Sequence, residues 1–326
     1  MKQERRNQEH SIERTERTLM RTGAKARFLM CRPEHFGVIY AINPWMDPAG
    51  WARHHDSLVP ASQQEWDGLY RTLTSLGAEI ELVSPAPGLP DLVFTANAAV
   101  VLDRRVLLAR FRHAERRREE PRFETAFAAL QARGLVDGIA MLPGDLVLEG
   151  AGDCVWDESR NLFWTGYGPR SDRRADRIVE DVFGVRTIAL ELADPRFYHL
   201  DTALCPLSGG EVMYAPIAFT EEGLAAIRAI VPPEQRIEIN EDDACRLAAN
   251  AVCLGSTVVL SSCSEGLRAM LAERGYRVDT APLPSFLKSG GSAFCLTLRL
   301  DRESEAARAS VGAQRLAAER PFREAC

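Results

Sequence analysis

Four short segments of the 326-residue sequence carry polar or nucleophilic side chains inside otherwise apolar runs. They read PDLVFTAN (90–97), LEGAGD (148–153), FYHLDT (197–202) and GGSAFC (290–295). Taken singly, such side chains are often turn caps that satisfy backbone groups, and Asp153 or His199 fits that reading. Together the segments supply a thiol, an imidazole, carboxylates and an amide. Those groups suit covalent catalysis with acid–base assistance.

Cys295 is the candidate nucleophile, because two glycines precede it and permit close approach of the backbone. A thiol nucleophile needs a proton shuttle, and His199 is the strongest candidate among six histidines. Glu149, in a glycine-rich turn, and Asp201, on the same strand face as His199, are carboxylates that could orient that ring. Carboxylates that converge on one pocket also attract a cation, and a guanidinium donates to two of them through its fork.

Composition limits the partners. The formal net charge is −6, which disfavours nucleic acid or an anionic membrane as the main partner. No apolar run is long enough for a membrane helix, and the N-terminus lacks a secretory h-region, so a cytoplasmic location is expected. The eight cysteines are expected to be reduced and show no zinc-ligand spacing. We therefore expect neither a metal nor a cofactor.

A unit of hairpin, helix and strand recurs along the chain with a period of 45–55 residues. The predicted hairpins are 92–111, 146–168, 202–219 and 251–262, and the single strands are 26–32, 79–85, 186–192, 235–240 and 276–283. Helices are predicted at 61–77, 121–134, 171–183, 220–231, 241–248 and 264–275. The pattern predicts a pseudo-symmetric, propeller-like α/β array whose hairpin ends meet at one point. Residues 1–24 are expected to be a flexible polar leader, 25–305 the array, and 306–326 a C-terminal helix or tail.

The four segments, in this order, resemble the guanidino-group-modifying superfamily, which includes arginine deiminases, dimethylarginine dimethylaminohydrolases, amidinotransferases and arginine dihydrolases. The resemblance covers about residues 25–301. HFGVIYAINPWMD (35–47), FTAN (94–97) and FRHAERRREEP (111–121) are most similar to bacterial arginine dihydrolases. The resemblance implies a five-bladed α/β propeller (pentein) with an axial active site. It also implies conversion of L-arginine to ornithine, ammonia and carbon dioxide.

Residue roles follow from the same resemblance. It implies that Cys295 attacks the guanidinium carbon and that His199 is the general acid and base. Glu149 and Asp201 are expected to hold the guanidinium or the imidazole, and Asn97 stands where deiminases carry an aspartate. The further residues expected to bind substrate are Asp91, Asp153, Arg116 and Arg170, the two arginines at the substrate carboxylate. Arg116 lies in a run of three arginines, and a solvated basic face is the competing reading.

Two features depart from the family pattern. Phe294 precedes the cysteine where a polar residue is expected, and the segment 47–55 is rich in proline and aromatic residues. The alternatives that remain are a single-step deiminase or dimethylarginine dimethylaminohydrolase, an amidinotransferase, and a non-catalytic amino-acid-binding propeller. The sequence leaves homo-oligomerisation open.

Overall fold

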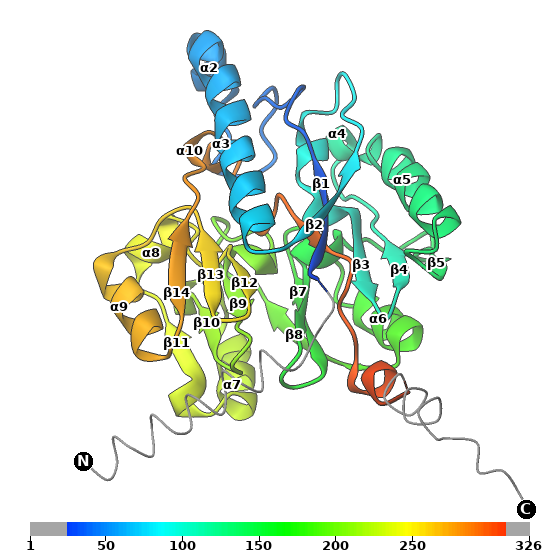
Figure 1. The fold of residues 1–326 in the computed structure, drawn as a ribbon, viewed down its shortest axis with the longest axis vertical. Coiled ribbons are helices and arrows are strands. Elements are labelled where there is room, and N and C mark those ends of the chain that lie inside the picture. Colours follow the sequence, from blue (N-terminus) through cyan, green and yellow to red (C-terminus); the bar gives the residue numbers. More distant parts are fainter. Residues whose placement is uncertain (1–24, 311–326) are drawn as a thin grey trace, which may run out of the picture.

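Five three-stranded sheets surround a common axis in the computed structural model, which describes residues 25–310 (Figure 1). In each sheet the middle strand pairs antiparallel with an inner strand and parallel with an outer strand. A helix connects each middle strand to the outer one, as a parallel pair requires. The predicted five-bladed α/β propeller is therefore confirmed.

Four blades follow the chain in the order inner strand, middle strand, helix and outer strand. The first comprises β3 (Ala99–Leu102), β4 (Arg105–Leu108), α5 (Glu120–Ala132) and β5 (Gly138–Ala140). The second comprises β6 (Cys154–Asp157), β7 (Leu162–Tyr167), α6 (Ala175–Phe183) and β8 (Arg186–Glu191). The third comprises β9 (Leu204–Pro206), β10 (Val212–Tyr214), α7 (Glu221–Ile230) and β11 (Arg236–Glu238). The fourth comprises β12 (Val252–Leu254), β13 (Thr257–Leu260), α9 (Glu265–Glu273) and β14 (Arg277–Thr280).

The fifth blade joins the two ends of the described chain. Its middle and outer strands are β1 (Arg27–Cys31) and β2 (Glu79–Val83), connected by α2 (Pro48–Arg53) and α3 (His55–Ser75). Its inner strand is the two-residue β15 (Leu298–Arg299), which pairs antiparallel with β1. The remaining α-helices of residues 25–310 are α4 (Ala114–Arg117), α8 (Glu241–Cys245) and α10 (Pro284–Leu287). The inner strand reaches β1 from the opposite end of the sequence, and this closes the ring.

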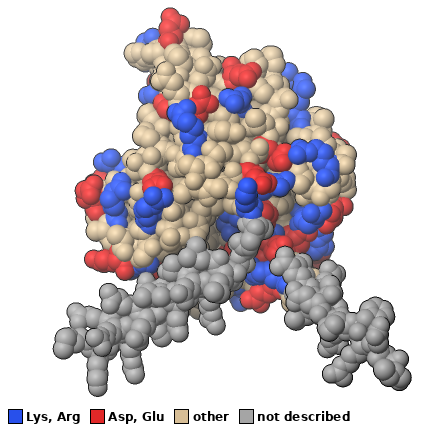
Figure 2. All heavy atoms as spheres, in the orientation of Figure 1, with Lys and Arg blue, Asp and Glu red and all other residues tan. Residues whose placement is uncertain are grey.

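The helices lie outside the ring and bury one apolar face against the sheets. Val179 and Phe183 of α6 pack with Phe163 of β7, and Ile227 of α7 packs with Met213 of β10. In Figure 1, α2 and α3 lie at one end of the molecule and α7 at the other. On the face in Figure 2, basic side chains lie beside acidic ones and form no broad patch of one sign. Within residues 25–310 no helix is both long and apolar enough to cross a membrane.

The predicted elements differ from the observed ones mainly at their ends. Residues 92–98, expected as strand, form two short 3-10 turns, Pro90–Val93 and Thr95–Ala98, so β3 starts later. The sequence reading also missed β5. The expected leader 1–24 lies outside the described residues, as does most of 306–326.

Candidate active site

Each inner strand is preceded by a turn, and each of these five turns carries a polar or nucleophilic side chain. Asn97 precedes β3, Glu149 precedes β6, His199 precedes β9, Asn250 precedes β12 and Cys295 precedes β15. All five side chains are buried, with at most 2% of their surface exposed. Direct contacts join Asn97, Glu149 and His199, and a separate contact joins Asn250 to Cys295. The propeller therefore brings together residues that are about fifty positions apart in the sequence.

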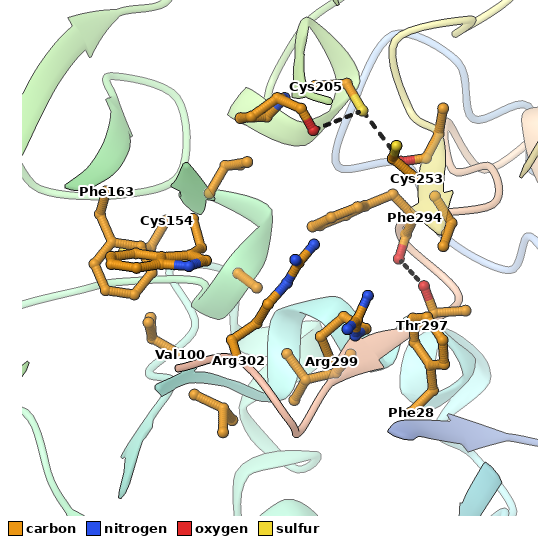
Figure 3. Close-up of a pocket in the computed structure, with 18 residues that line it drawn as sticks. Phe28, Val100, Cys154, Phe163, Cys205, Cys253, Phe294, Thr297, Arg299 and Arg302 are labelled. Atoms are coloured by element: carbon orange, nitrogen blue, oxygen red, sulfur yellow. Dashed lines mark hydrogen bonds between the residues drawn. The ribbon is translucent and has the colours of Figure 1, made fainter. Parts of the chain in front are cut away.

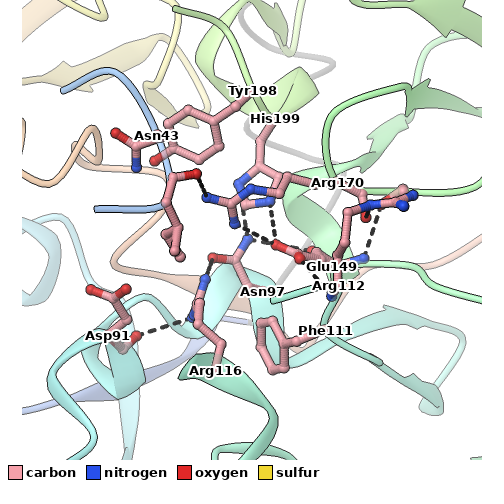
Figure 4. A network of polar contacts seen from close by, with 12 residues as sticks. Asn43, Asp91, Asn97, Phe111, Arg112, Arg116, Glu149, Arg170, Tyr198 and His199 are labelled. Atoms are coloured by element: carbon pink, nitrogen blue, oxygen red, sulfur yellow. Dashed lines mark hydrogen bonds and ion pairs between the residues drawn. The ribbon is translucent and has the colours of Figure 1, made fainter. Parts of the chain in front are cut away.

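His199 is held by a carboxylate that is itself held by an arginine (Figure 4). Its Nε2 lies 2.7 Å from Glu149 Oε2, and that oxygen also accepts from Arg170 Nη1 at 2.9 Å. The other Glu149 oxygen accepts from the backbone N–H of Arg112 at 3.1 Å. Burial alone would raise the pKa of Glu149, but Arg170 and the bond to His199 outweigh it and hold that pKa well below its usual range. Glu149 is therefore a permanent anion that fixes the imidazole.

Cys295 meets a different carboxylate. Its thiol donates to Asp201 Oδ2 at 3.1 Å, while Asn250 Nδ2 donates to the sulfur at 3.0 Å. Asn250 Oδ1 accepts from the backbone N–H groups of Ser292 and Cys295, both at 3.1 Å, which fixes this turn. Burial and the neighbouring Asp201 raise the pKa of Cys295 well above its ordinary value, so the resting group is a thiol.

Asp201 has one free acceptor. Burial raises its pKa to about 7, and the bonds from Cys295 and Asn250 only partly offset this. Its second oxygen, Oδ1, is buried and has no hydrogen-bond partner among the described residues. An unpaired buried acceptor costs the folded protein about 1–3 kcal/mol. A ligand that donates an N–H group to Asp201 Oδ1 removes this cost, and its binding free energy becomes more favourable by a similar amount.

We expect Asp201→Asn to raise the stability of the protein while lowering its activity. A raised carboxyl pKa means that the folded state of the wild type is penalised above about pH 7, by about 2–4 kcal/mol. The penalty shrinks as the pH falls from about 7 towards 4, where the unfolded carboxyl also takes up a proton. Urea unfolding at pH 8 and pH 5 should therefore show a gain for the variant that is larger at pH 8. Equal gains at both pH values would contradict the assigned titration.

Asn97 lies between His199 and a buried ion pair. Its Nδ2 is 3.3 Å from the backbone oxygen of Glu149 and 3.5 Å from His199 Nδ1. Its Oδ1 accepts from Arg116 Nη1 at 2.7 Å, and Arg116 Nη2 donates to Glu119 at 2.7 Å. Arg116 is 3% exposed, so the alternative reading of a solvated basic face is wrong for this arginine.

The other predicted substrate-binding carboxylates also lie in the buried core around these turns. Asp91 accepts from Tyr40 at 2.8 Å and from Ser289 at 3.4 Å, which ties the segment after β1 to the turn before Cys295. Asp153 accepts from Ser171 at 2.6 Å and from the backbone of Leu200 at 3.0 Å.

Asp91 and Asp153 both titrate above the usual range. Burial outweighs Arg116 and raises the pKa of Asp91, and burial raises that of Asp153 to about 6. Asp153 Oδ2 lies 4.0 Å from His199 Nε2. The observed hydrogen bonds of Asp91 and Asp153 connect elements of the protein, and contact of these two carboxylates with substrate stays a prediction.

Residues 40–46 adjoin the site. Arg170 Nη2 donates to the backbone oxygen of Ile42 at 3.1 Å, and the Arg170 guanidinium lies 4.7 Å from the centre of the Tyr198 ring. Asn43 donates to the backbone oxygen of Ser289 at 3.0 Å. The neighbouring segment 47–55, which departs from the family pattern, forms α2 and its flanks. A covering role for that segment stays a prediction.

The glycines before Cys295 make room for aromatic rings. A Cβ at Gly291 would lie 2.3 Å from Phe94, and one at Gly290 would lie 2.8 Å from Tyr198. Gly290 also has φ +82°, which favours glycine. Close approach therefore explains both glycines as expected, with Phe94 and Tyr198 as the approaching groups.

A separate cavity is lined by residues of all five inner strands (Figure 3). Cys154, Cys205 and Cys253 line it together with Arg302. Phe294 also lines it, although the next residue is the nucleophile candidate. Phe294, which departs from the family pattern, thus faces the axial cavity. None of the nine predicted site residues lines this cavity.

Comparison with known proteins places this geometry in a family. The model of the family described as N,N dimethylarginine dimethylhydrolase, eukaryotic, matches residues 32–302. The chain is 36% identical over 280 residues to the N(G),N(G)-dimethylarginine dimethylaminohydrolase of Mycobacterium tuberculosis, covering 86% of this chain and 87% of that protein. The chain belongs to the dimethylarginine dimethylaminohydrolase family.

Two relatives with higher identity have another activity in their names. The bifunctional arginine dihydrolase/ornithine cyclodeaminases ArgZ of Synechocystis sp. and AgrE of Nostoc sp. are each 42% identical, over 274 and 277 residues. The matches cover 84% and 85% of this chain but only 37% and 38% of those proteins. The crystal structure of the ArgZ N-terminal domain bound to substrate has a TM-score of 0.80 and covers 86% of this chain and 99% of that one. The superfamily assignment is thereby confirmed.

Sequence reasoning missed Asn250, Glu119 and Tyr198. Asn250 had a usable signal, because it continues the series 97, 149, 199 and 295 at the same spacing. Glu119 had none, since it lies among charged residues that read as an exposed face. Within residues 25–310, no group of three or more His, Cys, Asp or Glu side chains is arranged for a metal ion.

Proposed function

We propose that the chain is an arginine dihydrolase, which converts L-arginine and two waters to ornithine, two ammonia and carbon dioxide. The observation that carries this proposal is the orientation of the Asn97 amide, whose NH₂ group points towards His199 while its oxygen accepts from Arg116. An aspartate at this position would be a charged acceptor and would favour a cationic substrate only. The names and 42% identity of ArgZ and AgrE support it. The catalytic unit is residues 25–305, in a cytoplasmic protein that is compatible with a homo-oligomer.

The first half of the reaction uses the resting thiol. Bound arginine brings a guanidinium beside Cys295 and donates N–H groups to the unpaired Asp201 oxygen. The cation lowers the pKa of the thiol, and the proton passes to Asp201, 3.1 Å away. The thiolate attacks the guanidinium carbon, and His199 protonates the departing nitrogen. Ammonia is released, and the substrate remains bound to the Cys295 sulfur as a covalent thiouronium.

Water completes each cycle. His199, oriented by Glu149, takes a proton from water, which attacks the thiouronium carbon, and the C–S bond breaks to give citrulline. In the second cycle the thiolate attacks the ureido carbon and expels the second ammonia. Water then releases N-carboxyornithine, which loses carbon dioxide. Arg116 and Arg170 hold Asn97 and Glu149 in place during both cycles, and binding of the amino-acid carboxylate by these arginines stays a prediction.

Citrulline is neutral, so the second cycle cannot rely on attraction between carboxylates and a cation. A urea presents a carbonyl oxygen that accepts hydrogen bonds, and an amide NH₂ can donate to it. The Asn97 NH₂ group can supply such a donor by exchanging its long 3.5 Å contact with His199 Nδ1 for the urea oxygen, whereas an aspartate would repel that oxygen. This difference is the physical reason for preferring two cycles to one.

The test is an end-point assay with L-arginine that measures citrulline, ornithine and ammonia together. Ornithine with two ammonia per arginine supports the proposal, and citrulline with one ammonia overturns it in favour of a deiminase.

The second candidate is a dimethylarginine dimethylaminohydrolase, which the M. tuberculosis relative favours. Release of dimethylamine from dimethylarginine, without turnover of arginine, would support that candidate. No turnover of either compound would favour an amino-acid-binding protein.

A further inference from the structure

The buried ion pair of Arg116 and Glu119, which contacts Asn97, holds the Arg116 side chain in one position. Arg116 Nε donates to the two Glu119 oxygens at 3.0 and 3.2 Å, and Nη2 donates to Oε2 at 2.7 Å. Nη2 also donates to the backbone oxygen of Asp91 at 3.1 Å. Glu119 is fully buried, and the Arg116 guanidinium stacks 4.4 Å from the centre of the Phe111 ring. The side chain is thus restrained from several directions.

Arg116 Nη1 is the atom of this guanidinium that contacts Asn97, and it fixes the orientation of the Asn97 amide. A guanidinium carries donors alone, so it must meet an acceptor. Arg116 Nη1 therefore selects Asn97 Oδ1 and leaves Nδ2 towards His199 and the Glu149 carbonyl. The reverse orientation would place an NH₂ group against N–H groups 2.7 Å away.

We infer that Glu119 is a positioning residue, which acts through Arg116 to keep the Asn97 amide in its donor orientation and so commits bound citrulline to the second hydrolysis. The inference rests on the proposed dihydrolase function and adds a determinant of its product. With its oxygen turned to the substrate instead, Asn97 would be an acceptor, as an aspartate is. A guanidinium suits that acceptor, but the urea oxygen of citrulline does not.

Removing the charge of Glu119 should therefore change the product more than the first cycle. In Glu119→Gln the amide of glutamine replaces the carboxylate, and the short charge-assisted bonds to Arg116 weaken. Arg116 then shifts, and both Asn97 orientations become populated. We expect the ratio of citrulline to ornithine, per arginine consumed, to rise at least about tenfold, since about 1.4 kcal/mol of lost preference gives that factor.

The matched control is Glu120→Gln. Glu120 is the next residue on the chain, and its carboxylate accepts from the backbone N–H of Phe111 at 2.9 Å. It should leave the product ratio within about twofold of wild type. The product ratio does not depend on how much of a preparation is folded, so a purely structural defect would lower the rate and leave the ratio unchanged. Glu119→Asp keeps the charge with a shorter reach and should give an intermediate ratio.

The outcomes separate the two proposals. Wild type that yields ornithine, with unchanged ratios in Glu119→Gln and Glu119→Asp, overturns the role of Glu119 and leaves the dihydrolase assignment intact. An equal rise in Glu120→Gln overturns it too. Wild type that yields only citrulline overturns the dihydrolase assignment and this inference with it. If Glu119→Gln does not fold, the Glu119→Asp ratio decides alone, and no rise above wild type counts against the inference.

Discussion

Cys295→Ser should lose at least about 10⁴-fold in kcat on L-arginine, the scale seen when a covalent nucleophile is removed. A serine hydroxyl is far less acidic than a thiol, and the site offers little to ionise it. The nearest base, Asp201, is 3.1 Å from the sulfur but has a pKa of only about 7. The substrate cation can stabilise a thiolate, whereas an alkoxide stays out of reach at neutral pH.

Rapid-quench kinetics with intact-protein mass spectrometry would check this. Wild type should show a covalent adduct of arginine during turnover, and Cys295→Ser should show none while unfolding at nearly the wild-type temperature. Cys263→Ser is a suitable control, because that thiol is partly exposed and is not one of the buried turn residues of the candidate active site. Retained turnover in Cys295→Ser, or an adduct on another cysteine, would contradict the assignment of the nucleophile.

The ring itself was predictable because each blade repeats the same local signals. Hairpin turns, helix periods and third strands recur at about fifty residues, which predicts a propeller-like array of four or five units, and the number five comes from the family resemblance. The repeat also places the polar turns at equivalent positions, which is why four of the five turn residues could be picked out. Asn250 escaped because AANAVCLG reads as a small apolar run with one amide.

Closure of the ring was not predictable from local pattern. The run LTLRL (296–300) alternates, but β15 keeps only two residues of it, which is too short to assign to a sheet by pattern, and its partner β1 is some 270 residues away. The three-residue β5 escaped for the same reason. Such short strands form because a neighbouring strand pairs with them, β4 with β5 and β1 with β15, and tertiary contacts of this kind override weak strand propensity.

The same limit applies to the polar network. In AERRREEP three arginines and three glutamates look interchangeable, and each would ordinarily be solvated. Only the fold turns Arg116 and Glu119 inwards, where Asn97 and the Asp91 carbonyl receive the guanidinium. Sequence reasoning could therefore name Arg116 as a candidate but not its partner.

The last expected result concerns Asn97→Asp, which should turn a two-cycle enzyme into a one-cycle enzyme. The carboxylate replaces an amide of the same shape and can accept from Arg116 at the same place. It favours the guanidinium of arginine, so the first cycle should stay within about tenfold of wild type. It lacks any donor for the urea oxygen, so citrulline should leave before the second attack. We expect ornithine to fall at least about tenfold per arginine consumed, with one ammonia released.

Product analysis under saturating arginine would measure this, with Asn161→Asp as the matched control. Asn161 lies in the β6–β7 turn, where its oxygen accepts from the backbone of Glu305 at 2.7 Å, so the same substitution there changes charge without touching the site. Adding Glu119→Gln to Asn97→Asp should then change the product ratio little, because the amide that Glu119 orients is gone. An unchanged ornithine yield in Asn97→Asp would show that the donor at position 97 is not what carries citrulline into the second cycle.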